Sequence, residues 1–153
     1  MIRQLNLPAY EPRIRESHSG KQEIFDPVRR KYVRLSPEEW VRQHFLHYLM
    51  VYKGYPQSLM AVEASLSYNR QVKRSDILVY GPGGKPLLVV ECKAPEVELT
   101  QAVFDQVAMY NMSLMVGIVM ITNGLEHYAC SIDHEKRSYK FLTEIPDYAT
   151  LVH

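Results

Sequence analysis

The sequence lacks the features that mark several classes of protein. Its longest apolar run falls well short of the roughly 20 residues that a transmembrane helix needs. The first residues, 1–6, contain no apolar core of a signal peptide. The net charge is only +1, so bulk charge does not indicate a nucleic-acid partner. We therefore expect a cytoplasmic protein that does not engage a membrane.

Cysteine is scarce, and the chain contains no internal repeat or low-complexity segment. Cys92 and Cys130 fall in strand-like segments and lack the spacing of a zinc site. Buried thiols are therefore expected rather than a disulfide. The length of 153 residues suits one domain with a substantial core.

Short β-type runs and two amphipathic segments predict a single-domain mixed β-sheet flanked by helices, of the α/β or α+β class. The expected elements are a hairpin at 22–25 and 31–34, a helix from 36 to about 54, strands at 59–68, 74–80 and 87–93, a helix from 100 to about 114, a strand at 116–122 and a hairpin at 128–132 and 139–142. The strands at 87–93 and 116–122 are joined by a helix, so they can be parallel. We expect residues 1–35 to form an N-terminal β-hairpin extension, 36–145 the core, and 146–153 a C-terminal tail.

The first helix has a clear start signal. Ser36 is a suitable N-cap, Pro37 suits the first helical position, and Glu39 stands where a capping box places its acid. Gly54 and Pro56 are typical of the helix end. The capping box is the preferred explanation for Glu39.

The most informative stretch is Glu91-Cys92-Lys93, which closes the apolar run at 87–90. Side chains two apart on a strand share a face, and buried charges are costly unless they are paired or hold a metal. If Tyr80 and Leu87 flank a six-residue loop, Asp76 lies opposite Glu91, with Cβ atoms about 4.5–5.5 Å apart. A divalent cation would turn the repulsion of the two acids into coordination.

Structural alternatives exist for each of these charges. Asp76 can be a strand-end acid paired with Arg74 or with a turn amide. Glu91 and Lys93 can form a salt bridge on the same face at the rim of the sheet. Such pairings would need no ligand.

An acid on one strand, followed by acid-x-Lys on the next and then a helix, resembles the PD-(D/E)xK nuclease superfamily. Asp76 and the segment 91–93 supply this pattern, and Gln106 with Tyr110 fits a Q-x-x-x-Y motif of some of these nucleases. Together with the segment 122–124, the set resembles the N-terminal nuclease domain of type I restriction enzyme R subunits. The resemblance spans about residues 36–124 and implies a restriction-endonuclease-like core.

The resemblance implies a DNA endonuclease that depends on Mg²⁺ or Mn²⁺. Asp76, Glu91 and the backbone carbonyl of Cys92 would hold the ion, and Lys93 would orient or help to deprotonate the attacking water. Glu39 or Glu63 is a candidate supplementary ligand, and the face taken by Glu63 stays open.

Support for the nucleic acid is assigned to Gln106 and Tyr110, which share a helix face, and to the basic residues Arg70, Lys73 and Arg74. In the structural alternative, Gln106 is an exposed helix residue, Tyr110 lies at the edge of the core, and the basic residues belong to a solvated turn. The choice of DNA over RNA follows from the resemblance alone.

R subunits continue into a helicase motor. This sequence contains no Gly-rich phosphate loop followed by Lys-Ser or Lys-Thr, so either the protein acts alone or a separate helicase, translocase or specificity subunit is its partner. Nuclease domains of this size often pair to cut both strands, which makes a homodimer a candidate assembly. The alternative function is a non-catalytic nucleic-acid-binding or assembly module that retains the nuclease fold.

Overall fold

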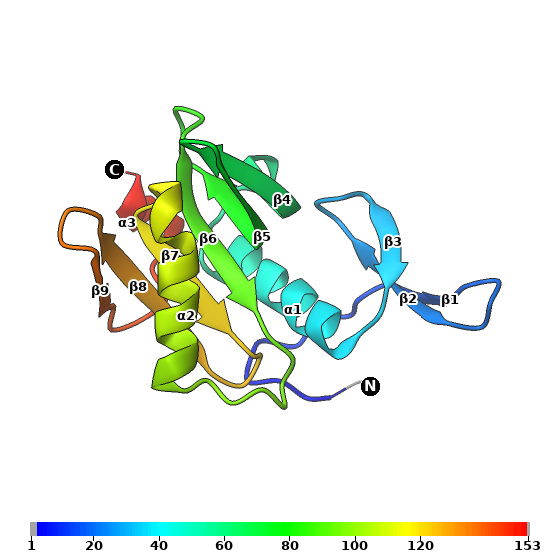
Figure 1. Cartoon of the computed structure of the whole chain (residues 1–153). Helices are drawn as coiled ribbons and strands as arrows, with labels where there is room; N and C mark the ends of the chain where they lie inside the picture. The colour runs from blue at the N-terminus through cyan, green and yellow to red at the C-terminus, as the bar shows by residue number, and fades with distance from the viewer. Residues whose placement is uncertain (1–2, 153) are drawn as a thin grey trace.

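The computed structural model describes residues 3–152, which form two β-sheets and flanking helices (Figure 1). A small antiparallel sheet near the N-terminus contains β1 (Ile14–Glu16), β2 (Gln22–Asp26) and β3 (Lys31–Arg34). The main sheet holds six strands in chain order, namely β4 (Met60–Tyr68), β5 (Gln71–Tyr80), β6 (Pro86–Cys92), β7 (Ile118–Thr122), β8 (His127–Asp133) and β9 (Ser138–Phe141). β6 and β7 are parallel, and the other neighbours are antiparallel. The predicted mixed sheet is confirmed.

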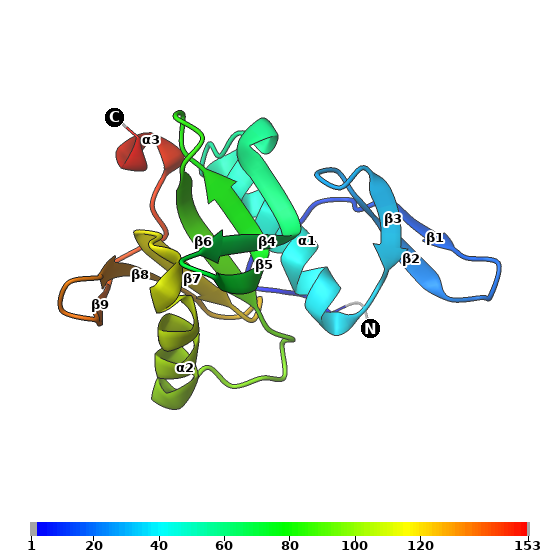
Figure 2. The same ribbon diagram turned by 45° about the horizontal axis from the view of Figure 1, so that its top comes forward.

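Two helices cover opposite faces of the main sheet (Figures 1 and 2). α1 (Pro37–Tyr52) buries Phe45, Leu46 and Leu49 against the face that carries Ile77 and Val90. α2 (Gln101–Asn111) packs on the other face in a separate hydrophobic cluster, and a 3-10 turn, η2 (Met112–Leu114), follows it. The remaining short elements are η1 (Gln57–Leu59) and α3 (Tyr148–Leu151). The main sheet is therefore the middle of three layers, as expected for strands that are apolar on both faces.

The first helix begins where the sequence predicts. The Ser36 side chain accepts a hydrogen bond from the Glu39 amide at 3.0 Å, and Gly54, with a φ of 71°, follows the last turn. The reciprocal half of the capping box is not formed, because the Glu39 carboxylate is bonded to Arg29, Arg42 and Gln43. The hydrogen bond from the Glu39 backbone amide to the Ser36 side chain is therefore enough to fix the start of the helix.

The pairing of β5 with β6 sets the geometry of the candidate site. Ile77 faces Val90, so one step further along the same register brings Asp76 beside Glu91, as predicted. At the other end, Tyr80 pairs with Pro86 rather than with Leu87, because an irregularity after Val79 shifts the register by one residue. The bulge lies on the loop side and leaves the acid end unchanged.

Both ends of the described chain pack against the core. Near the N-terminus, Leu5 is buried and the backbone N–H of Asn6 donates to the Gly124 carbonyl at 2.9 Å. In the segment expected to be a tail, Tyr148 is buried, and its hydroxyl donates to the Tyr80 carbonyl at 3.3 Å. Residues 146–152 therefore lie on the core as part of its packing. No helix within residues 3–152 is long and apolar enough to span a membrane, and both cysteines are unpaired and buried, as predicted.

Candidate active site

Three acids lie at one level of the main sheet, on three neighbouring strands. On either side of Glu63, residues of β4 pair with residues of β5 in a register that places Glu63 beside Asp76. The β5–β6 register places Asp76 beside Glu91 in turn. Glu63 has a φ of 55°, a left-handed conformation that costs a non-glycine residue about 1–2 kcal/mol. A strained residue inside a strand, level with two further acids, marks this end of the sheet as a candidate site.

The Asp76 carboxylate is held by two donors. Oδ2 accepts a hydrogen bond from the Cys92 backbone N–H at 2.7 Å, and Oδ1 accepts one from Arg42 at 2.9 Å. Ile77 and Val90 are the last pair of β5 and β6 at this end of the sheet. The bond to Cys92 takes the place of the next backbone hydrogen bond between the two strands. Asp76 is therefore fixed by the fold itself and does not pair with Arg74, the partner named by the structural alternative.

Arg42 is the hub of the acid cluster. Its two terminal nitrogens donate to Glu39 at 2.7 Å, to Glu63 at 2.7 Å and to Asp76 at 2.9 Å, and Glu38 lies 3.6 Å away. Only 5% of its side chain is exposed. Burial lowers the pKa of Arg42, but the charges of Glu39 and Asp76 outweigh it, so the pKa is raised overall. One buried guanidinium thus compensates the acids that converge from α1, β4 and β5.

The network continues from α1 into the N-terminal sheet. Arg29 donates to both Glu39 oxygens at 3.0 and 3.1 Å and to Asp26 at 2.6 Å. Gln43 donates to Asp26 and Glu39 at 3.0 and 2.9 Å. Asp26 is fully buried, and its Oδ1 accepts two backbone amides of the β2–β3 turn. A continuous chain of charged groups therefore runs from Asp26 through Arg29, Glu39 and Arg42 to Asp76.

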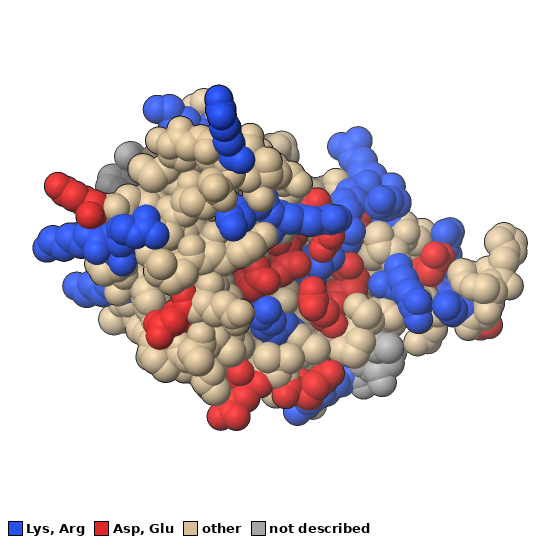
Figure 3. Space-filling view, in the orientation of Figure 1, with Lys and Arg blue, Asp and Glu red and all other residues tan. Residues whose placement is uncertain are grey.

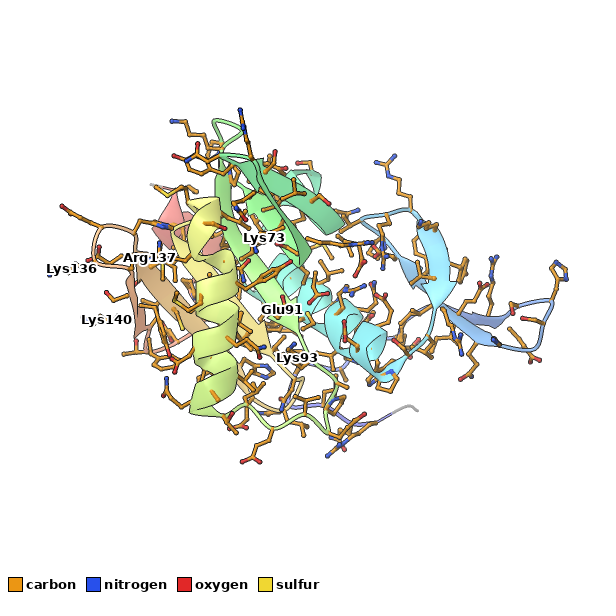
Figure 4. The ribbon with its side chains drawn as sticks, in the orientation of Figure 1. Lys73, Glu91, Lys93, Lys136, Arg137 and Lys140 are labelled. Carbon is orange, nitrogen blue, oxygen red and sulfur yellow. The ribbon has the colours of Figure 1, made fainter. Side chains whose placement is uncertain are left out.

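Glu91 and Lys93 differ from this buried chain because they open to solvent. They project between α1 and α2 (Figure 4), and Lys93 Nζ lies 3.7 Å from Glu91 Oε1. Burial raises the pKa of Glu91 to about 7, and the Asp76 charge raises it further, while Lys93 opposes the shift. The raised pKa of Glu91 thus reflects mainly the loss of water around its carboxylate, and secondly the nearby Asp76 charge.

A cleft of about 220 Å³ opens beside this pair. It is lined by Glu91 and Lys93 of the β6 end, by Arg74 of β5, and by Gln106, Val107 and Tyr110 of α2. The structure thus brings both members of the Q-x-x-x-Y pair to the same cleft as the acid-x-Lys motif.

The basic residues assigned to nucleic-acid support lie on the β4–β5 hairpin. Lys73 Nζ lies 4.4 Å from the ring centroid of Tyr110, and Arg74 pairs with Glu63. Arg70 lies on the exposed turn of the hairpin, where Asn69 and Arg70 both have a positive φ, and it does not line the cleft. Figure 3 shows the acids gathered in a hollow, with basic side chains over the β4–β5 hairpin on one side and over the N-terminal sheet on the other.

The donor set fits a hard cation of the magnesium type. Within residues 3–152, no three His, Cys, Asp or Glu side chains are arranged around a common ion position. Mg²⁺ needs only one or two carboxylates, because it keeps several water ligands. Asp76 and Glu91 are such a pair, because the β5–β6 register places them side by side. Glu39 and Glu63, the candidate supplementary ligands, use their oxygens on arginines and on Gln43. Asp76 likewise uses both of its oxygens, on Arg42 and on the Cys92 amide, so a metal would have to share these oxygens with their donors.

Arg42 is the residue that sequence reasoning missed. The signal was present in the helical period, since Glu39, Arg42 and Gln43 occupy the same stripe of α1 as Leu46 and Leu49. Polar residues at core-facing positions are expected to be paired with one another or with groups beneath the helix.

Comparison with known proteins places the fold first. The structure aligns with that of a fragment of a putative HsdR subunit of a type I restriction enzyme from Vibrio vulnificus YJ016, with a TM-score of 0.54 and 19% sequence identity. The match covers 76% of this chain and 24% of that one, so this chain spans about a quarter of the HsdR chain.

The sequence then gives the family. Residues 37–146 match the family described as type I restriction enzyme R protein N terminus, and the chain belongs to that family. The resemblance to the N-terminal domain of R subunits is thereby confirmed. No curated protein matches the sequence.

Proposed function

We propose that the protein hydrolyses phosphodiester bonds of DNA with the help of Mg²⁺ or Mn²⁺. The observation that carries this proposal is the pairing of Asp76 with Glu91 on neighbouring strands, beside a cleft that also contains Lys93. Membership of the R-subunit N-terminal family supports the same reaction class and a DNA substrate. In such a system, separate motor or specificity subunits would be partners.

Each residue has a distinct role in this proposal. Asp76 and Glu91 would hold the metal, and the backbone carbonyl of Cys92 would add a third oxygen. When bound, the metal supplies positive charge that polarises the phosphate and lowers the pKa of coordinated water. Lys93 is a compact cation with 34% of its side chain exposed, which suits it to orient the attacking water and to offset phosphate charge.

The Cys92 N–H bond to Asp76 is the main source of preorganisation. It fixes the Asp76 carboxylate relative to the backbone between Glu91 and Lys93. Gln106 and Tyr110 form the opposite wall of the cleft, where their polar atoms can contact the phosphate backbone. Lys73 and Arg74 extend this wall with positive charge.

A non-catalytic DNA-binding or assembly module is the second candidate. One specific observation favours it, because Arg42 already donates to Asp76 Oδ1 and so supplies part of the positive charge that a metal would bring. A module of this kind would keep the fold and the basic hairpin without using the acids in a reaction.

Metal binding and cleavage, measured separately, distinguish the two candidates. Mg²⁺ at about ten times its dissociation constant should stabilise the protein by about 1.4 kcal/mol, which is a rise of a few degrees in melting temperature. Asp76→Asn and Glu91→Gln should abolish this rise. Lys93→Ala should keep most of it and lose cleavage of duplex DNA.

Glu135→Gln is the matched control, since Glu135 is an exposed acid of the β8–β9 turn, away from the cleft. It should retain both the metal effect and cleavage. A wild-type melting temperature that does not respond to Mg²⁺ or Mn²⁺ would refute the metal site. A metal response without cleavage on single-stranded, duplex or branched DNA would favour the second candidate.

A further inference from the structure

The outer face of the N-terminal sheet carries arginines laid on aromatic rings. Ile14 and Ile24 pair with each other, and Ile24 is fully buried in the core, so the residues flanking them point to the opposite side. We call that opposite side the arginine face. It consists of Arg13, Arg15, Glu23, Phe25, Tyr32 and Arg34.

Two of its arginines are ordered by stacking. The guanidinium carbon of Arg13 lies 4.2 Å from the centroid of Phe25, and that of Arg15 lies 3.9 Å from the centroid of Tyr32. A stacked guanidinium uses its flat face on the ring and leaves its edge donors for a planar or tetrahedral anion, although Arg15 already donates its Nε–H to Glu23. Because the side chains are already ordered, binding an anion costs less conformational entropy.

The charge of the arginine face is positive after its internal pairing is counted. Arg15 pairs with Glu23 at 2.9 Å, and Glu23 also stands opposite Arg34 in the β2–β3 register. One acid thus faces three arginines, and Arg13 and Arg34 are both exposed. Arg30 and Lys31, both exposed, add positive charge at the adjacent β2–β3 turn. Surfaces of this kind fit the phosphate backbone of nucleic acid, to which stacked or planar arginines bind well.

The position of the arginine face relative to the cleft indicates which partner it would bind. The N-terminal sheet joins the acid cluster directly through Arg29, which binds Glu39. Figure 3 shows basic side chains over this sheet and over the β4–β5 hairpin, with the acidic hollow between them. A duplex whose scissile phosphate lay at the hollow would meet positive charge on both sides.

We propose that the arginine face binds the phosphate backbone of duplex DNA next to the segment held at the cleft. The inference rests on the proposed function, because that function makes DNA the partner. It goes beyond the family match, which begins at residue 37 and does not include this sheet.

The experiment measures binding of a fluorescent duplex by the full chain in EDTA, so that the result does not depend on metal. Arg13→Gln combined with Arg34→Gln should lower the affinity and reduce the slope of log K against log salt concentration by about 2. The ratio of the wild-type affinity to the affinity of the double variant should then fall roughly tenfold between about 50 and about 200 mM salt.

The matched control removes the same charge from the opposite end of the molecule. Lys136→Gln combined with Lys140→Gln acts on the exposed β8–β9 hairpin, which lies far from the N-terminal sheet in Figure 4. This variant should keep the wild-type affinity and salt slope. An equal loss in both double variants would mean that only bulk charge matters and would overturn the proposal.

A second measurement uses the wild-type protein, so its result does not depend on whether the variants fold. Phenylglyoxal should modify Arg13 and Arg34 in the absence of DNA, and the duplex should protect both. Unchanged modification with bound duplex, or unchanged affinity in the arginine variant, would overturn the proposal and point to an acidic protein partner instead. Failure of the nuclease would appear differently, as a missing effect of Mg²⁺ on melting.

Discussion

Replacing Arg42 with methionine is the most direct test of how the acid cluster is held together. Methionine has a similar length but no charge, so the substitution removes donors to Glu39, Glu63 and Asp76 at once. Glu39 and Asp76 are 6% and 9% exposed, and neither can recover its full hydration. Removing one partner of a buried ion pair costs about 3–5 kcal/mol, and we expect a loss in that range.

The assay is urea unfolding followed by the fluorescence of Trp40. Trp40 is the single tryptophan of the sequence, is buried, and lies on α1 two residues before Arg42. Arg74→Met is the matched control, because Arg74 also pairs with Glu63 but has a side chain that is 65% exposed. An exposed pair contributes less than about 1 kcal/mol, so this variant should unfold close to the wild type.

One further result would identify the origin of the loss. Arg42→Lys should lose less than Arg42→Met, since it keeps the charge but not the forked donors. A loss below about 1 kcal/mol for Arg42→Met, or an equal loss for Arg74→Met, would refute the view that Arg42 is the compensating charge of the cluster.

Two more predictions concern pH and backbone geometry. The folded state raises the pKa of Glu91 from 4.5 to about 7, so it binds a proton that the unfolded chain releases. In EDTA, stability should therefore fall by on the order of 3 kcal/mol as pH rises through this window, and urea unfolding of Glu91→Gln should not show that fall. Gly124→Ala should destabilise by about 1–3 kcal/mol in thermal melting, because φ is +86° and a Cβ would lie 2.8 Å from Leu5 and 3.1 Å from Val41. Gly83→Ala, with open space around it, should melt near the wild type, and equal losses at both glycines would contradict the steric argument.

The acid end of the sheet could be predicted because it depends on local rules. Strand alternation and the loop between β5 and β6 were sufficient to place Asp76 beside Glu91, and the helical period placed Gln106 and Tyr110 on one face. The bulge after Val79 did not spoil the prediction, because it lies at the loop end of the hairpin.

Other parts of the structure depend on contacts that the sequence does not display. β1 was missed because three residues with two exposed charges carry almost no hydrophobic pattern. β5 begins at Gln71, earlier than predicted, because its polar start is paired with β4 across the turn at Asn69 and Arg70. The role of Arg42 was missed because two of its partners, Glu63 on β4 and Asp76 on β5, lie 21 and 34 residues away in the sequence.

The chain of charged groups from Asp26 to Asp76 has a practical consequence for anyone who shortens this protein. The family match starts at Pro37, so a fragment cut at that point would seem to retain the whole motif. It would lack Asp26 and Arg29, leaving Glu39 without one of its cations at the first turn of α1. The charged groups of the site therefore begin before the first residue of the family match. A fragment that begins at residue 37 would have a site with a different charge.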